Sequence, residues 1–234
     1  MQEIKTELRA NLEAIQKRIK IAAKVGHRII EDIELLPVTK YQPIEKIEAL
    51  IDLGLSRFGE NYAQELLEKE AHFLNHKEKP KWVYIGQLQS NKIQRLVQTA
   101  DEIQTVASIK HARYIERYSY AAGKTHYPIY IHVNAAAEAS KSGVSIESAN
   151  QLAATIKNEC PNLRIMGIMA IPPAEVSRSA SIDNIPSLYY KIAETAVTVG
   201  EGKLSLGMSA DLESAIIVGS TCVRIGTALL GERG

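Results

Sequence analysis

Apolar residues recur every three or four positions at the start of the chain. They are Ile4, Leu8, Leu12, Ile15, Ile19 and Ala23, and the positions between them are mostly polar. In a helix of 3.6 residues per turn, this spacing places the apolar side chains along one stripe. The pattern predicts an amphipathic helix over about residues 2–24.

After this helix, short apolar runs alternate with helical patterns. The runs have the length of buried strands and lie near 33–39, 55–58, 82–86, 102–106, 128–133, 164–168, 203–206 and 221–225. The helical patterns between them cover about 43–54, 61–74, 90–99, 108–123, 145–159, 185–200 and 209–220, and several begin at Ser or Asn and end near Gly. Strict alternation of strand and helix predicts parallel strands joined by right-handed crossovers.

Eight such strands predict a closed (β/α)8 TIM barrel, a fold that needs roughly 200 residues or more. We expect one domain over residues 1–234, with the N-terminal helix added to the barrel. The alternative is an open, doubly wound sheet, but no GxGxxG motif follows the first strand to favour a dinucleotide fold. The loop around 172–183 is expected to be the most mobile.

Charge and composition narrow the class of protein. The 28 Lys and Arg residues nearly balance 27 Asp and Glu residues, and no polybasic block favours nucleic acid or a membrane surface as a partner. The first residues lack the apolar core of a signal peptide, and no run reaches the ~18 apolar residues of a membrane helix. Two cysteines and six histidines without ligand spacing do not favour a metal site. We expect a soluble, cytoplasmic protein.

Polar residues follow several of the predicted strands. Lys40 ends the first run, "FGEN" follows the second, "GQLQSNK" the third, "MSAD" the seventh and "RIGT" the eighth. Binding groups of such a barrel gather at the C-terminal ends of its strands, so these segments are expected to meet at one opening.

Lys40 is the candidate nucleophile at this opening. A lysine at a strand end is usually solvated and protonated, but an amine in an apolar setting loses its proton more easily and attacks aldehydes. Lys40 is therefore a candidate for a Schiff base. Its partner could be a carbonyl substrate or pyridoxal 5′-phosphate (PLP).

The C-terminal segment favours a phosphorylated partner. "GMSADLESAI" predicts a helix entered through Ser209, and the last strand delivers Gly226 and Thr227 to its C-terminal end. Barrels often bind phosphate with the loops after strands seven and eight and a helix N-terminus. Hydroxyl donors and a glycine that permits close backbone approach suit such an anion site.

Several segments together resemble one known family. "LLPVTK", "FGENYAQE", "IGQLQSNK", "SKSGV", "GIMAIPP", "LSLGMSADLESAI" and "GSTCVRIGTALLGER" occur in this order from 33 to 233. This ordered set is similar to the YggS/PROSC family of PLP homeostasis proteins. The resemblance implies a barrel like the N-terminal domain of alanine racemase and PLP held as an internal aldimine. It also implies a monomer with a role in intracellular vitamin B6 and amino-acid homeostasis, without established catalysis.

The resemblance also assigns the residues of the site. Lys40 would form the aldimine, and Arg224 would lie beside the pyridine nitrogen. Phosphate would be bound by Ser209, Gly226 and Thr227, and Asn61 and Met208 would line the cofactor. An arginine at the pyridine nitrogen keeps it unprotonated, which weakens the electron sink that many PLP enzymes use.

The chain departs from the family pattern in three places. Pro37-Val38-Thr39-Lys40-Tyr41 stands where the family usually has Ala-Val-Ser-Lys-Thr. Val83 and Gln87 replace common histidines, and Leu206 replaces a common methionine. The assignment of Lys40 survives these changes, but the role of the third-strand loop in transferring PLP stays open.

Catalytic alternatives remain beside the PLP-binding regulator. A PLP-dependent racemase or lyase needs a further acid–base group, which in alanine racemase is a tyrosine from a separate domain. The sequence ends seven residues after Thr227, so we expect that domain to be absent. Tyr41, Tyr62 and Tyr84 lie near the expected opening but in no motif that marks a base. A Schiff-base aldolase without cofactor is the third alternative.

Other residues have two interpretations each. Lys92 is either a second PLP acceptor or a residue on a helix surface, and Lys141 either contacts an anion or is solvated. Glu60 either hydrogen-bonds within the second-strand loop or caps a helix. PLP-dependent apo-enzymes are the expected partners.

Overall fold

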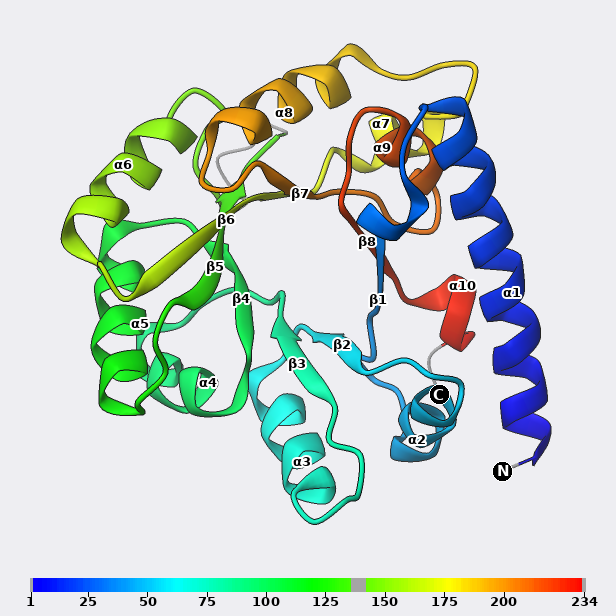
Figure 1. Cartoon of the computed structure of the whole chain (residues 1–234), viewed down its shortest axis with the longest axis horizontal. Coiled ribbons are helices and arrows are strands. Elements are labelled where there is room, and N and C mark those ends of the chain that lie inside the picture. Colours follow the sequence, from blue (N-terminus) through cyan, green and yellow to red (C-terminus); the bar gives the residue numbers. More distant parts are fainter. Residues whose placement is uncertain (1, 136–141, 233–234) are drawn as a thin grey trace.

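Parallel strands surround a common centre in the computed structural model, which describes residues 2–135 and 142–232 (Figure 1). The strands are β1 (Glu34–Pro37), β2 (Arg57–Glu60), β3 (Lys81–Tyr84), β4 (Glu102–Val106), β5 (Tyr127–Val133), β6 (Leu163–Ala170), β7 (Lys203–Ser205) and β8 (Cys222–Ile225). Each overlaps a run predicted from the sequence, because buried parallel strands are apolar on both faces.

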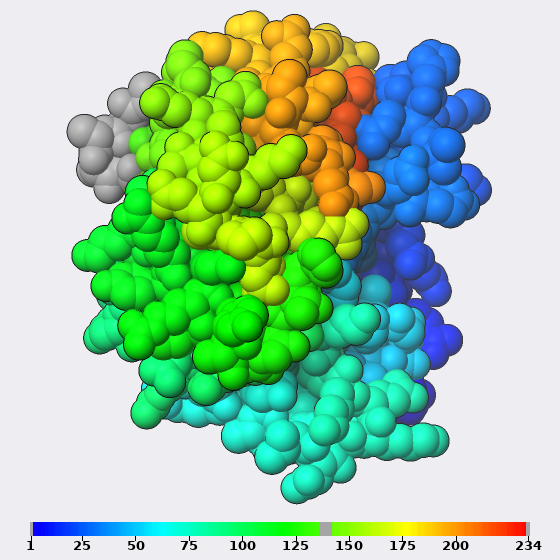
Figure 2. All heavy atoms as spheres, turned by 60° about the vertical axis from the view of Figure 1, so that its left-hand side comes forward, coloured from blue at the N-terminus to red at the C-terminus, as the bar shows by residue number. Residues whose placement is uncertain are grey.

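Helices lie outside the strands and follow them in turn (Figure 1). They are α1 (Gln2–Val25), α2 (Ile44–Asp52), α3 (Ala63–Phe73), α4 (Ile93–Thr99), α5 (Ile109–Ala121), α6 (Ala149–Glu159), α7 (Ala174–Ser179), α8 (Ser187–Thr198), α9 (Leu212–Ile217) and α10 (Thr227–Leu230), with 3₁₀ turns η1 (Ile30–Asp32) and η2 (Ser90–Lys92). On one side, α5, α6 and α8 pack next to one another as an outer layer (Figure 2).

The sheet is a nearly closed barrel in which the described strands β1 and β2 do not form a ladder, and we call their contact the seam. Its strand order is β1-β8-β7-β6-β5-β4-β3-β2, and all pairs are parallel. Across the described residues, β1 and β2 are joined by a single bridge from Val38 to Gly59, where Thr39 N donates to Gly59 O at 3.0 Å. The predicted (β/α)8 barrel with an extra N-terminal helix is confirmed, and the alternative of a doubly wound sheet is wrong.

Apolar packing is concentrated between the strands and the helices. The large core cluster contains α1 residues such as Leu12 and strand residues such as Phe58 and Ile131. A separate, smaller cluster comprises Leu36, Val38, Val83, Ile85 and Cys222. Polar side chains occupy other positions inside the barrel, where the hydrogen bond from Ser205 on β7 to Gln104 on β4 joins strands that are not neighbours.

Two local predictions were wrong. The helix expected to begin at Ser209 begins at Leu212, because Asp211 accepts a hydrogen bond from Met208 N at 2.6 Å and closes a turn before the helix. The stretch expected as a loop at 172–183 contains α7, which follows Pro173 as proline favours a helix start. A helix of six residues is too short to show a period in the sequence.

The described residues contain neither a candidate membrane-spanning helix nor a candidate metal cluster. There, no helix is both long and apolar enough to cross a membrane. Within the same ranges, no three His, Cys, Asp or Glu side chains cluster in a way that could hold a metal ion.

Candidate functional site

A cavity of about 340 Å³ lies at the C-terminal ends of β1, β2, β3, β6, β7 and β8. It is lined by Val38, Lys40, Asn61, Ile85, Met169, Ile171, Met208, Ser209, Ala210, Arg224, Gly226 and Thr227. This list includes every residue that the sequence assigned to cofactor binding. The volume lies within the roughly 300–1,000 Å³ that is usual for small-molecule sites.

Lys40 enters this cavity from the turn after β1. Its side chain is half-buried, and among the described residues no hydrogen bond or ion pair engages its Nζ. The adjacent residues are held firmly, since Thr39 is fully buried and Tyr41 N donates to Glu65 Oε2 at 2.9 Å. The amine is therefore available to a ligand while its backbone is fixed.

Arg224 forms the inner wall of the cavity. It is buried on β8, and its guanidinium donates to Ser205 Oγ at 2.7 Å and to the Ala170 carbonyl at 2.9 Å. Burial lowers the pKa of Arg224, since desolvation disfavours the charged form. The two hydrogen bonds fix the plane of the guanidinium group.

Hydrogen bonds continue from Arg224 through the barrel. Ser205 Oγ donates to Gln104 Oε1 at 2.7 Å, and Gln104 Nε2 donates to Glu102 Oε1 at 2.7 Å. Glu102 in turn pairs with Arg57 at 3.2 Å. We call Arg224, Ser205, Gln104 and Glu102 the polar chain. It connects the cavity wall to the opposite end of the barrel.

The loops after β7 and β8 supply the predicted anion-binding residues. Ser209 lies in the turn before α9, and Thr227 begins α10. Leu229 N and Leu230 N donate to the Gly226 carbonyl, and the N–H groups of Thr227 and Ala228 precede this first helical hydrogen bond. A Cβ at Gly226 would meet the Val38 carbonyl at 3.6 Å, so protein packing alone does not require glycine there. The role of Gly226 toward an anion stays a prediction.

Helix α1 supports both of these loops. Arg18 donates to the Ser209 carbonyl at 3.0 Å and makes two hydrogen bonds to Glu213, at 2.6 and 2.8 Å. Asn11 donates to the Leu229 carbonyl of α10 at 3.0 Å. The helix that is added to the barrel therefore contacts both predicted anion-binding segments.

Asn61 presents an unsatisfied polar atom. Its Oδ1 is buried and has no hydrogen-bond partner among the described residues, although the side chain lines the cavity. Buried polar atoms normally have a partner, so this atom suits a ligand with a donor group. Gly86 permits the position of Asn61, because a Cβ there would lie 1.8 Å from the Asn61 carbonyl oxygen.

The three candidate tyrosines do not line the cavity. Tyr41 and Tyr62 are exposed and contact each other with ring centroids 4.9 Å apart and ring planes tilted by 42°. Tyr84 is buried and donates to the Gln87 carbonyl at 3.0 Å, and burial raises its pKa to about 12. A phenol of such pKa is a poor base near neutral pH.

The remaining candidates lie outside the cavity or the described residues. Lys92 is exposed on η2, which agrees with a surface role. Val83 belongs to the small apolar cluster and Gln87 is exposed, and neither lines the cavity. Lys141 lies outside the described residues.

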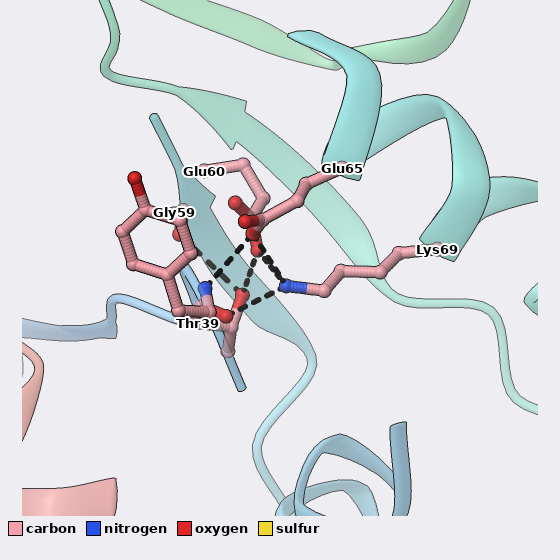
Figure 3. A network of polar contacts seen from close by, with 6 residues as sticks. Thr39, Gly59, Glu60, Glu65 and Lys69 are labelled. Carbon is pink, nitrogen blue, oxygen red and sulfur yellow. Dashed lines mark hydrogen bonds and ion pairs between the residues drawn. The ribbon is translucent and has the colours of Figure 1, made fainter. Parts of the chain in front are cut away.

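Sequence reasoning missed a buried polar network at the seam. Glu60 Oε1 accepts hydrogen bonds from Thr39 Oγ1 at 2.6 Å and from Lys69 Nζ at 2.5 Å (Figure 3). Glu60 therefore forms hydrogen bonds, but its partners follow β1 and lie on α3 and not in the second-strand loop. A signal for Lys69 was present, because it falls on the buried stripe of α3 with Leu66 and Phe73. A lysine at an apolar position of a helix indicates a buried partner.

Comparisons with known proteins match nearly the whole chain. The family model described as alanine racemase, N-terminal domain, matches residues 7–234. The pyridoxal phosphate homeostasis protein of Pseudomonas aeruginosa is 38% identical, with 95% of this chain and 94% of that protein covered. The protein of the same name from Escherichia coli K12 is 36% identical, with 95% of each chain covered.

A solved structure gives a third comparison. PipY of Synechococcus elongatus PCC7942, solved with PLP bound, has a TM-score of 0.72 and 25% identity, with 93% of this chain and 100% of PipY covered. The match of family model, sequence and fold extends over nearly the whole chain. The chain therefore belongs to the family of pyridoxal phosphate homeostasis proteins.

Proposed function

We propose that the cavity binds PLP and that Lys40 attaches it covalently. The observation that carries this proposal is the meeting of Lys40, Arg224, Ser209 and Thr227 around one cavity. The neutral Lys40 amine would add to the PLP aldehyde, form a C=N bond and release the aldehyde oxygen as water. Hydrolysis would reverse this bond. The unpaired Oδ1 of Asn61 supports the fit, because it offers a bound molecule an acceptor.

The wall of the cavity favours holding PLP over turnover. Arg224 can only donate hydrogen bonds, so a pyridine nitrogen placed against it must accept and stay unprotonated. Among the described residues, no tyrosine lines the cavity as a second base. We infer a non-catalytic PLP-binding protein, and turnover of amino acids by the loaded protein would support the racemase or lyase alternative instead.

We infer a role in the supply of intracellular PLP. The support is the name of the relatives from P. aeruginosa and E. coli, together with PLP in the PipY structure. The proposed partners are PLP and PLP-dependent apo-enzymes, and the proposed state is a cytoplasmic monomer. The formal net charge of +1 gives no electrostatic reason for a nucleic-acid or membrane partner.

The first experiment locates the bond to PLP. Protein with added PLP is examined by visible absorbance, reduced with borohydride, digested and mapped by mass spectrometry. We expect a yellow band that disappears on reduction and leaves a pyridoxyl group on Lys40. We expect Lys40→Ala to lose this label and keep its melting temperature, because Lys40 Nζ has no protein partner among the described residues.

Lys92→Ala is the matched control, since Lys92 is an exposed lysine near the same end of the barrel. This variant should retain the band and the label. Label spread over surface lysines in the wild type, or a Lys40→Ala protein that still gives the yellow band, would contradict the proposal.

A further inference from the structure

Two lysines near the end of β1 have different surroundings. Lys69 Nζ donates to the Thr39 carbonyl at 2.6 Å, to Glu60 Oε1 at 2.5 Å and to Glu65 Oε2 at 3.2 Å (Figure 3). An ammonium group has three N–H donors, so the capacity of Lys69 is filled. Lys40, by contrast, has no partner for Nζ among the described residues.

The network around Lys69 holds both neighbours of Lys40. Thr39 is bound twice, because its carbonyl accepts from Lys69 and its hydroxyl donates to Glu60. Tyr41 is bound through its N–H to Glu65 and has φ of 59°, in the left-handed region that bulky residues rarely adopt. The surrounding contacts thus impose a backbone shape at 39–41 that the local sequence does not favour.

The same contacts complete the barrel below Lys40. Thr39 follows the end of β1, Glu60 ends β2, and these strands share only the bridge from Val38 to Gly59 within the described residues. Lys69 reaches this seam from α3 and links the two sides through its side chain. The position of the backbone at Lys40 therefore depends on side-chain contacts, because β1 and β2 do not form a backbone ladder there.

Burial makes this network costly, because one of its charged atoms, Glu60 Oε2, has no hydrogen-bond partner among the described residues. The side chain of Glu60 is fully buried and that of Lys69 is 7% exposed. Burial raises the pKa of Glu60, and the nearby Lys69 ammonium opposes that rise. A buried ion pair contributes little net stability compared with apolar packing of the same volume. What distinguishes this pair is the geometry that it imposes on Thr39.

We propose that Lys69, together with Glu60 and Glu65, positions Lys40 for reaction with the aldehyde of PLP. Lys69 stays bound to its three acceptors, and Lys40 is left as the reactive amine. The inference rests on the proposed function, since it concerns the same covalent bond.

The test compares two lysine-to-methionine variants. Lys69→Met removes the three hydrogen bonds of Lys69 and leaves those from Thr39 to Glu60 and from Tyr41 to Glu65. Lys124→Met is the matched control, because Lys124 donates to the carbonyls of Val97, Gln98 and Ala100 at a site remote from the cavity. Hydrogen exchange of the peptide 38–42 is measured without PLP. The rate of bond formation is measured with PLP by trapping with borohydride and mapping the label.

We expect Lys69→Met to accelerate exchange at 38–42 and to slow labelling of Lys40 by about 10- to 100-fold, as small misplacements of reacting groups do. Lys124→Met should change neither quantity. If Lys69→Met does not fold, the double variant Lys69→Met/Glu60→Gln removes the uncompensated buried charge and is measured in its place.

Glu65→Ala removes the acceptor of the Tyr41 N–H at a partly exposed position. It should accelerate hydrogen exchange around Tyr41. Unchanged exchange and labelling in the Lys69 variants would overturn the inference and leave the proposed function intact. A wild-type protein that is never labelled at Lys40 would refute the proposed function instead. Faster exchange at 38–42 in Lys69→Met would then still show that Lys69 fixes the backbone around Lys40.

Discussion

His132 illustrates how single buried residues set the response to pH. It lies on β5 inside the barrel and is 8% exposed. Burial, and then the charge of Arg224, lower the pKa of His132 to about 4. The folded protein therefore keeps this imidazole neutral at pH values where an unfolded chain would protonate it.

The pH dependence of stability follows from this shift. Because the folded pKa lies below the unfolded value near 6.5, the stabilisation is complete above pH 6.5 and is lost as pH falls toward 4. We expect a loss of roughly 3 kcal/mol in the free energy of unfolding across this window. Denaturant unfolding at several pH values should show this loss in the wild type and a much smaller one in His132→Gln.

His76→Gln is the control for this measurement, since His76 is exposed in the loop before β3. It should follow the wild-type curve. Parallel pH curves for wild type and His132→Gln would show that His132 does not carry the effect.

At the residue scale, the sequence predicted the cavity well but not its support. The barrel itself brings together Lys40, which follows β1, and Arg224 and Thr227, which lie on β8 and after it. The bonds of Lys69 and Gln104 depend on which side chains face each other across the seam and the interior. No local pattern in a single sequence encodes such pairings.

At the scale of elements, α1 has a function that its amphipathic pattern does not reveal. The apolar stripe predicted its buried face correctly, including Leu8, Leu12, Ile15 and Ile19. Its polar face carries Arg18, which binds the loop containing Ser209. The period of a helix shows which side is buried, but it does not show which distant loop its polar residues meet.

Arg18→Ala tests this connection. Loss of the contact should loosen the Ser209 loop and weaken binding of pyridoxine 5′-phosphate by about 3- to 10-fold, equivalent to ~1 kcal/mol. Binding of pyridoxine, which lacks the phosphate, should hardly change. Equilibrium titrations with both ligands check the difference.

Arg113→Ala provides the comparison, since Arg113 on α5 pairs with Glu159 on α6, away from the cavity. It should bind both ligands as the wild type does. If Arg18→Ala weakened the binding of both ligands equally, the cause would be a general loss of structure and not a change in the loop expected to bind phosphate.

At the scale of the whole molecule, the barrel is uneven around its circumference. β5 and β6 pair through seven registered residues, whereas β1 and β2 share one bridge in the described chain. The topology follows from the alternation of strands and helices, which the sequence displays. The location of the weak joint does not follow, because it depends on strand tilt and length.

Native-state hydrogen exchange should detect this unevenness. Without ligand, we expect the amide of Thr39, bonded across the seam, to exchange through local opening, and the amide of Ile131 in β5 to exchange only near global unfolding. Residue-resolved exchange by NMR measures both. Equal protection at the two positions would mean that the side-chain network closes the seam as firmly as a full ladder.

The polar chain has a final consequence for proton movement. Arg224 can only donate at one end, and the Glu102 carboxylate, paired with Arg57, can only accept at the other. Every hydrogen bond between them therefore points one way, from Arg224 toward Glu102, and Ser205 and Gln104 have no alternative orientation. The aligned hydrogen bonds of such a chain polarise one another, but the chain does not relay protons. A proton that a ligand in the cavity gains or loses therefore does not pass along this chain to Glu102.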